Sequence, residues 1–222
     1  MDYCYPYPHP AVTTDMVIFT IRDSQLSVLL IQRRDNPFKG LWALPGGFVH
    51  EDEDVDQCAR RELEEETGLK DIYLEQLYTF GKPDRDPRER VISVAYFALL
   101  PSSPLKIRAA SDASDVTWHE VSSIPALGFD HNTIIKIALE RLIAKLDYST
   151  IAFQLLPDLF TLTEVQKVYE IILGQDIDKR NFRKQILALD NVKKTKQQRR
   201  EGAHRPAFLY TLKKRDTIEW TR

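Results

Sequence analysis

The sequence predicts an α+β protein made of two modules, and three observations support this fold class. Residues 1–147 contain several apolar stretches of strand length together with two helical patterns. Residues 158–222 contain two shorter helical patterns followed by a basic, alternating segment. The charge also changes along the chain: residues 1–150 carry 16 Lys and Arg against 24 Asp and Glu, whereas residues 151–222 carry 15 against 9. We therefore expect an acidic domain at residues 1–147, a linker at residues 148–157 and a basic domain at residues 158–222.

The composition is that of an ordinary globular protein and gives no sign of a membrane or secreted protein. Its 222 residues are 43% hydrophobic, and the longest apolar run, at residues 91–100, is too short to span a bilayer. A secretory signal requires a basic segment followed by an apolar one, and residues 1–10 contain no such pattern. The two cysteines, Cys4 and Cys58, have neither the number nor the spacing of a disulfide framework or a metal site. We expect a cytoplasmic protein with no membrane partner.

The acidic domain is predicted to be rich in strands. Five strands are expected, at residues 15–21, 26–34, 72–80, 91–100 and 116–121. A turn at Asp23 and Ser24 separates the first two. Residues 130–146 repeat apolar side chains at helical spacing, and residues 54–67 are predicted to form the other helix of this domain.

The predicted helix at residues 54–67 has an unusual inward face. At about 100° per residue, the apolar side chains of Val55, Cys58 and Ala59 fall on one side. The same side continues as three carboxylates, at Glu62, Glu65 and Glu66. Burying like charges costs several kcal/mol each unless they are paired or bound to a metal. The pattern therefore indicates a divalent cation site, and a solvated acidic surface is the alternative interpretation.

The same stretch resembles the Nudix box. Gly47 is followed after five residues by Glu53 and after seven more by Arg61-Glu-Leu-Glu-Glu-Glu-Thr-Gly-Leu69, which matches the fixed positions of that motif. The resemblance implies a Nudix fold, an α/β/α sandwich with a mixed sheet, and a hydrolase that cleaves a diphosphate linkage with Mg²⁺ or Mn²⁺. It implies metal ligands at Glu62, Glu65, Glu66 and the Gly47 carbonyl.

The resemblance also implies roles in catalysis. Glu65 or Glu66 is expected to act as the base, and the sequence does not decide which of the two does so. Arg61 is expected to support catalysis through an internal pair with Glu53 that holds the helix against the loop and orients the metal ligands. A site that binds its ligand but turns it over slowly is the alternative.

Residues 80–90 resemble a segment of ADP-ribose-type Nudix proteins. Within it, Lys82, Arg85 and Arg88 are expected to contact phosphates of the ligand. Phe48 is expected to stack on an adenine ring. The alternatives are a charged surface loop for the cations and core packing for the aromatic side chain.

The basic domain has the sequence layout of a winged helix-turn-helix. Thr161 and Glu164 form a capping box for a helix that ends before Gly174, and Asp178 can cap a second helix that runs to about Leu189. A basic segment from residue 192 and an alternating strand at residues 207–212 complete the layout. On the second helix, apolar and basic side chains occupy different faces.

This basic domain resembles the C-terminal domain of Nudix-related transcriptional regulators. In that family a Nudix domain senses a metabolite, often ADP-ribose in the control of NAD synthesis, and the winged helix binds a double-stranded DNA operator as a homodimer. The resemblance implies DNA contacts at Arg180, Arg183, Lys184, Lys194, Lys196 and Arg205.

Three functions follow from these patterns. We expect a metabolite-responsive transcriptional regulator whose Nudix domain binds, and also hydrolyses, ADP-ribose or a related nucleoside diphosphate derivative. The first alternative is a Mg²⁺-dependent hydrolase of the ADP-ribose pyrophosphatase type whose C-terminal domain serves dimerisation. The second alternative is a regulator that responds to a sugar.

Overall fold

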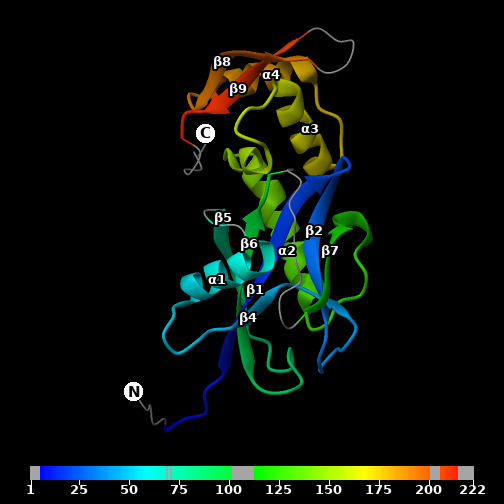
Figure 1. The fold of residues 1–222 in the computed structure, drawn as a ribbon, viewed down its shortest axis with the longest axis vertical. Coiled ribbons are helices and arrows are strands. Elements are labelled where there is room, and N and C mark those ends of the chain that lie inside the picture. Colours follow the sequence, from blue (N-terminus) through cyan, green and yellow to red (C-terminus); the bar gives the residue numbers. More distant parts are fainter. Residues whose placement is uncertain (1–5, 69, 71, 102–112, 201–205, 215–222) are drawn as a thin grey trace. The chain divides into compact units, whose positions relative to one another are not determined.

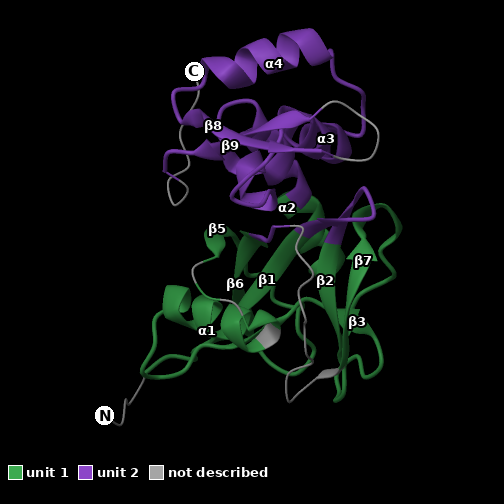
Figure 2. Cartoon of the chain, turned by 45° about the horizontal axis from the view of Figure 1, so that its top comes forward, with its two compact units in different colours: residues 1–19, 28–98, 105–138 green, residues 20–27, 99–104, 139–222 purple. Residues whose placement is uncertain are grey.

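The computed structural model describes residues 6–68, 70, 72–101, 113–200 and 206–214, without the side chains at positions 66, 113 and 114. The chain divides into two compact units (Figure 2). Unit 1 contains residues 1–19, 28–98 and 105–138, and unit 2 contains residues 20–27, 99–104 and 139–222. Among the residues described, no helix combines the length and the apolar character needed to cross a membrane.

The N-terminal part of the chain forms one mixed sheet of seven strands (Figure 1). The strands are β1 (Ala11–Arg22), β2 (Gln25–Arg33), β3 (Trp42–Ala43), β4 (Gly46–Phe48), β5 (Tyr73–Phe80), β6 (Val91–Leu99) and β7 (Ala113–Glu120). Their order is β3-β2-β1-β6-β5, with β4 paired to β1 and β7 paired to β2. All five predicted strands are confirmed. The sequence analysis missed β3 and β4, because two or three residues are too few to show an alternation.

The turn between β1 and β2 is the one that the sequence predicts. Asp23 and Ser24 both have positive φ angles, 47° and 62°. Two consecutive residues of this kind match the right-handed twist of the strands that they join. Asp23 is tolerated there because its short polar side chain can bond to the local backbone.

The core of unit 1 lies on both faces of β1. Met16, Val17, Ile18 and Phe19 are each fully buried, which requires cover on both faces, since neighbouring side chains in a strand point in opposite directions. Two helices supply cover in this part of the chain: α1 (Val55–Thr67) and α2 (His131–Leu146). A one-turn helix, η1 (Val121–Ser123), precedes α2. The sandwich of helices and mixed sheet is therefore confirmed.

Helix α1 begins and ends where the sequence predicts. Asp54 accepts a hydrogen bond from the Gln57 backbone nitrogen, and the Gln57 side chain accepts one from the Asp54 nitrogen. These reciprocal bonds satisfy two backbone donors that the first turn leaves free. At the other end, Gly68 adopts the left-handed conformation with φ of 70°, which glycine adopts without steric cost.

Unit 2 contains the winged helix-turn-helix that the sequence predicts. Its elements are η2 (Ile151–Leu155), α3 (Leu162–Leu173), α4 (Lys179–Ala188), β8 (Val192–Arg199) and β9 (Ala207–Leu212). The capping box of α3 is present, because Thr161 and Glu164 exchange hydrogen bonds between side chain and backbone. β8 and β9 pair antiparallel as the wing.

Residues 148–157, predicted to be a linker, form a packed part of unit 2. Ile151, Ala152, Phe153 and Leu155 are fully buried on η2, and η2 contacts α3. An apolar run of this kind has to be covered, since leaving it in water forfeits the free energy of its burial.

Candidate functional site

Arg61 on α1 holds the loop before the helix. Its Nε and Nη2 atoms donate to the two carboxylate oxygens of Glu53, at 3.0 and 2.7 Å, and its Nη1 donates to Glu62 Oε1 at 2.7 Å. The expected pair between Arg61 and Glu53 is therefore confirmed. Hydrogen bonds from Arg61 lower the pKa of Glu53 to about 2, and the same bonds raise the pKa of Arg61 above its usual range. Both groups stay charged at any physiological pH.

Gly47 on β4 and Glu62 on α1 lie in direct contact. A Cβ atom added at Gly47 would stand 2.0 Å from Glu62 Oε1, so only glycine lets the carboxylate approach the backbone here. Glu62 itself is largely buried. The structure thus brings together two of the groups that the sequence analysis proposed as metal ligands.

The other two glutamates stand differently. The side chain of Glu65 is 52% exposed, and its nearest carboxylate oxygen lies 3.6 Å from Arg61 Nη1. The expectation that it faces inward like Glu62 is therefore wrong, because α1 turns this position toward solvent. The side chain of Glu66 lies outside the described part of the structure.

The donor groups at this end of α1 suit a hard cation. Mg²⁺ prefers oxygen ligands and keeps several waters, so a few carboxylates and a backbone carbonyl are enough to hold it. Among the side chains that the structure describes, no group of three acidic, histidine or cysteine residues forms a closed metal cage. The contact between Gly47 and Glu62 nevertheless fits a site of this open kind.

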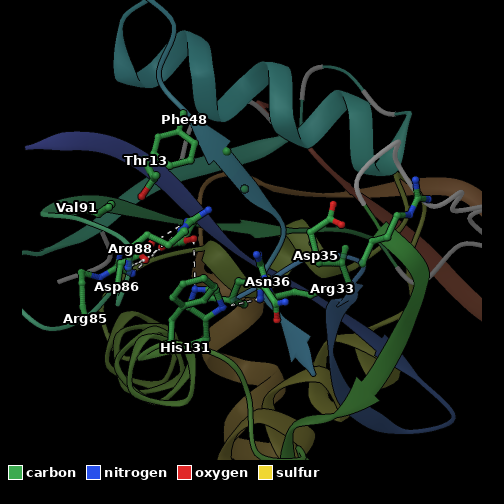
Figure 3. A pocket seen from close by; sticks show the side chains of 17 residues that line it. Thr13, Arg33, Asp35, Asn36, Phe48, Arg85, Asp86, Arg88, Val91 and His131 are labelled. Atoms are coloured by element: carbon green, nitrogen blue, oxygen red, sulfur yellow. Dashed lines mark hydrogen bonds and ion pairs between the residues drawn. The ribbon is translucent and has the colours of Figure 1, made fainter. Parts of the chain in front are cut away.

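A cavity in unit 1 opens beside β4 (Figure 3). Its walls come from β1, β2 and the loop that follows β2, β4, the loop before β6 and the start of α2. Charged side chains line much of it, among them Asp15, Arg33, Arg34, Asp35, Arg85, Asp86 and Arg88. Phe48, Phe129 and His131 supply its aromatic wall.

A buried ionic network forms one wall of this cavity. Arg85 donates to Asp15 at 3.0 Å and to both oxygens of Asp130, at 3.1 and 2.8 Å. Ser93 also donates to Asp15, at 2.5 Å. Only 3% of the Arg85 side chain is exposed. This guanidinium is therefore committed to two carboxylates, and its expected contact with ligand phosphates remains a prediction.

His131 completes the network. The Leu44 backbone nitrogen donates to His131 Nδ1 at 2.8 Å, so the other ring nitrogen carries the hydrogen. That nitrogen, Nε2, lies 3.5 Å from Asp15 Oδ1. Burial alone would raise the pKa of Asp15, but His131, Arg85 and Ser93 together hold it well below its ordinary value.

Two of the cations proposed as ligand contacts differ in position. Arg88 lines the cavity, pairs with Asp86 at 2.8 Å and lies over the rings of Phe48 and Phe129, at 5.6 and 5.9 Å. Its side chain remains 40% exposed. Lys82 does not line the cavity and instead pairs with Asp84 at 3.2 Å. Arg88 and Phe48 therefore line the cavity, and Lys82 lies outside it.

Thr13 on β1 carries a hydroxyl that lacks a partner. Its Oγ1 atom is buried without a hydrogen bond among the described residues, although Thr13 lines the cavity. The residue stands opposite Phe48 in the pairing of β1 with β4. A buried hydroxyl without a partner costs about 1–3 kcal/mol, so a ligand atom or a water is needed to satisfy it.

The sequence analysis missed Asp15, Ser93, His131 and Thr13 as site residues. A signal existed for Asp15, since an acidic residue directly before the apolar run at residues 16–19 has to be paired when buried. His131 and Ser93 show no spacing that relates them to it.

The basic face of unit 2 is formed by α4 and the wing. Phe182 and Ile186 are buried, whereas Arg180 and Lys184 are exposed on the same helix. Arg183 is partly buried and donates to Thr163 Oγ1 at 3.2 Å.

The wing adds two of the proposed DNA contacts. Lys194 lies over the Phe208 ring, with 3.4 Å between its Nζ atom and the ring centroid. Lys196 is exposed on β8. Arg205 lies outside the described residues.

Two family models match this chain. Residues 11–138 match the NUDIX domain, and residues 152–212 match the NrtR DNA-binding winged helix domain. The chain belongs to the Nudix family, in the branch that carries an NrtR DNA-binding winged helix domain. The winged helix match begins within the segment predicted as a linker, which agrees with the packing of η2 into unit 2.

Two NrtR-type relatives, one of them in two crystal structures, are similar to this chain. An ADPR-responsive transcriptional repressor of Acinetobacter baylyi is 41% identical over 95% of this chain and 85% of its own length. The crystal structure of Shewanella oneidensis NrtR complexed with a 27mer DNA has a TM-score of 0.82, at 41% identity over 91% of this chain and 93% of that one. The NUDIX domain of the same protein, complexed with ADP ribose, has a TM-score of 0.56, at 42% identity over 61% of this chain and 90% of that one.

The network around Asp15 predicts how the stability of the protein changes with pH. The pKa of Asp15 is lower in the folded protein than in the unfolded chain, where it is about 3.9. Its contribution to the unfolding free energy is therefore fully present above about pH 4 and is lost as the pH falls further.

We predict that Asp15→Asn lowers the unfolding free energy at pH 7 by about 3–5 kcal/mol, because Arg85 loses a buried partner. The difference from wild type should shrink between about pH 4 and pH 2. Urea unfolding followed by tryptophan fluorescence measures it, with the exposed Asp52→Asn as the matched control. A difference that stays constant across this range would contradict the assignment.

Proposed function

We propose that this protein is a metabolite-responsive transcriptional regulator. Its Nudix domain binds ADP-ribose or a related nucleoside diphosphate derivative, and its winged helix binds operator DNA as a homodimer. The observation that carries the proposal is the presence of both parts in one chain: a cavity lined by cations and aromatic rings, and a helix that buries its apolar face and exposes Arg180 and Lys184. The relatives that are ADPR-responsive or bound to DNA support it. Acting on DNA, such a regulator works in the cytoplasm.

The cavity suits a nucleoside diphosphate. Arg33 and Arg88 bring positive charge to the cavity. Arg33 lies over the Phe129 ring, and Arg88 lies over the rings of Phe48 and Phe129. Guanidinium groups bind phosphates through charge-assisted hydrogen bonds, and an aromatic wall accepts a flat base. Arg88 lies over the Phe48 ring, but the residue is still 40% exposed, which leaves part of the ring open to a base.

The groups around α1 are those that would hold Mg²⁺ or Mn²⁺: Glu62, Glu65, Glu66 and the Gly47 carbonyl. When bound, the cation supplies neutralisation of phosphate charge and a more acidic water. Arg61 keeps Glu62 and the loop at residues 48–54 in place through its three short hydrogen bonds. Burial of Glu62 against Gly47 fixes the position of one carboxylate before any ligand arrives.

DNA binding gives the direct test of the proposal. The protein is expected to retard a DNA fragment from its own upstream region in a gel-shift at low salt. If about six phosphates are neutralised, the affinity should fall with salt at a log–log slope near −5. The double variant Arg180→Ala, Lys184→Ala should bind more weakly and show a slope reduced by about two units.

The control for that measurement is Lys136→Ala, which removes an exposed cation from α2 in unit 1. It should leave both affinity and slope unchanged. No retardation by the wild-type protein at low salt would overturn the regulator proposal. If the double variant and Lys136→Ala lose the same amount of DNA affinity, α4 has no specific role in binding.

Thr13 provides a test of the ligand site. Thr13→Val keeps the shape of the side chain but removes the hydroxyl that lacks a partner. We expect ADP-ribose to bind roughly 5- to 10-fold more weakly, since one hydrogen bond contributes about 1 kcal/mol. Isothermal titration calorimetry measures the change, and Thr13→Ser should keep wild-type affinity. If Thr13→Val binds ADP-ribose as tightly as wild type, the hydroxyl has no part in recognition.

A hydrolase is the second candidate function, and the intact set of box residues favours it. In that case Mg²⁺ should allow the protein to release AMP and ribose 5-phosphate from ADP-ribose. Glu65→Gln should abolish this release while leaving ADP-ribose binding within a few-fold of wild type. If wild type and Glu65→Gln are equally inert, the domain binds ADP-ribose without hydrolysing it. If the wild type hydrolyses ADP-ribose and also binds DNA specifically, hydrolysis removes the ligand and so terminates the signal.

A further inference from the structure

A second cavity, of about 620 Å³, lies entirely within unit 2. The end of α2, helix α3, the segment before α4 and α4 itself form its walls. Six large apolar side chains line it: Leu146, Leu173, Ile177, Phe182, Ile186 and Leu189. This volume lies within the range of about 300–1,000 Å³ that is usual for small-molecule sites.

Besides Ser149, whose hydroxyl donates to the Lys145 carbonyl oxygen, three polar residues line this cavity: Asp147, Tyr169 and Gln185. Within the described parts of the chain, none of their side chains forms a hydrogen bond or an ion pair. A cavity that combines apolar side chains with a few convergent polar groups is the usual form of a ligand site. These polar groups can therefore bind the polar end of a ligand whose apolar part fills the cavity.

The charge at the mouth of the cavity is negative. Asp147 contributes an exposed carboxylate directly after Leu146, the last residue of α2. The C-terminus of a helix also carries a partial negative charge from its last carbonyls. Burial, and then the charge of Asp147, raise the pKa of Tyr169 to about 12, so its hydroxyl stays protonated and neutral. The wall groups therefore favour a cation over an anion.

We propose that this cavity is a second ligand site, which takes a small molecule with an aromatic or branched apolar body and a primary amine. The apolar body fills the space among the six apolar side chains. The ammonium group lies at Asp147 and donates to its carboxylate, with the Tyr169 oxygen and the Gln185 amide as further acceptors. Because α3 and α4 both form walls, such a molecule touches the helix proposed to face DNA. This site is independent of the nucleotide cavity in unit 1.

Three probes of one size separate the apolar contribution from the charge. They are 2-phenylethylamine, neutral 2-phenylethanol and anionic 3-phenylpropanoate, each titrated into the full chain with labelled isoleucine methyl groups. The amine should shift the methyl signals of Ile177 and Ile186 saturably and leave that of Ile18 in unit 1 unchanged. It should bind about tenfold more tightly than the alcohol, the gain from one charge-assisted hydrogen bond, and the anion should bind least.

Matched variants locate the site. Asp147→Asn should remove the preference for the amine over the alcohol while the alcohol still binds. Ala188→Phe should fill the cavity and weaken all three probes. Asp190→Asn is the control, since this exposed carboxylate on the same unit pairs with Lys213 instead. The affinity for ADP-ribose, measured on the same samples, separates failure of this proposal from failure of the regulator function.

Three results would overturn the proposal. Equal affinities for the three probes would show that no group in the cavity selects a cation. If Asp147→Asn and Asp190→Asn weaken the preference for the amine equally, that preference arises from the net charge of the protein and not from this cavity. Methyl shifts at Ile177 and Ile186 that depend on protein concentration without any probe would show that a second copy of the chain covers the cavity.

Discussion

The site in unit 1 depends on one buried cation, Arg85. A buried guanidinium costs several kcal/mol unless carboxylates surround it, and here Asp15 and Asp130 do so, at 3.0 and 2.8 Å. These partners come from β1 and from the residue before α2, while Arg85 itself comes from the loop before β6. One charge therefore ties three segments together, and the cavity exists where they meet. Arg88, Thr13 and His131 owe their places in its wall to this arrangement.

A second guanidinium explains the spacing of the sequence motif. Arg61 reaches Glu53 and Glu62 at once, and Glu62 lies against Gly47 without room for a side chain. The spacing of Gly47, Glu53 and Glu62 in the sequence allows the loop and the helix to contact each other at the Arg61 side chain. The resemblance to the Nudix box therefore predicted the pair, and the local sequence pattern predicted the bounds of the helix. It could not predict that Glu65 faces solvent, because helical periodicity does not say how far a neighbouring loop covers the face.

Elements set by local sequence signals could be predicted, whereas contacts between residues far apart in the chain could not. Helices α1 and α3 begin and end at local signals, such as the capping box at Thr161 and the glycine at 174, which act within a few residues. The network of Asp15, Arg85 and His131 joins residues far apart in the chain, and no local pattern relates them. The buried segment η2 was expected to belong to a linker, because its four apolar residues show no periodicity that would reveal what they pack against.

We propose that one chain couples a nucleotide site to a DNA site, and coupling of this kind is reciprocal. The most direct test measures ADP-ribose affinity with and without operator DNA, and operator affinity with and without ADP-ribose. We predict that each ligand changes the affinity for the other by the same factor, typically about 5- to 150-fold. Two ligands that each bind but leave the affinity for the other unchanged would contradict it.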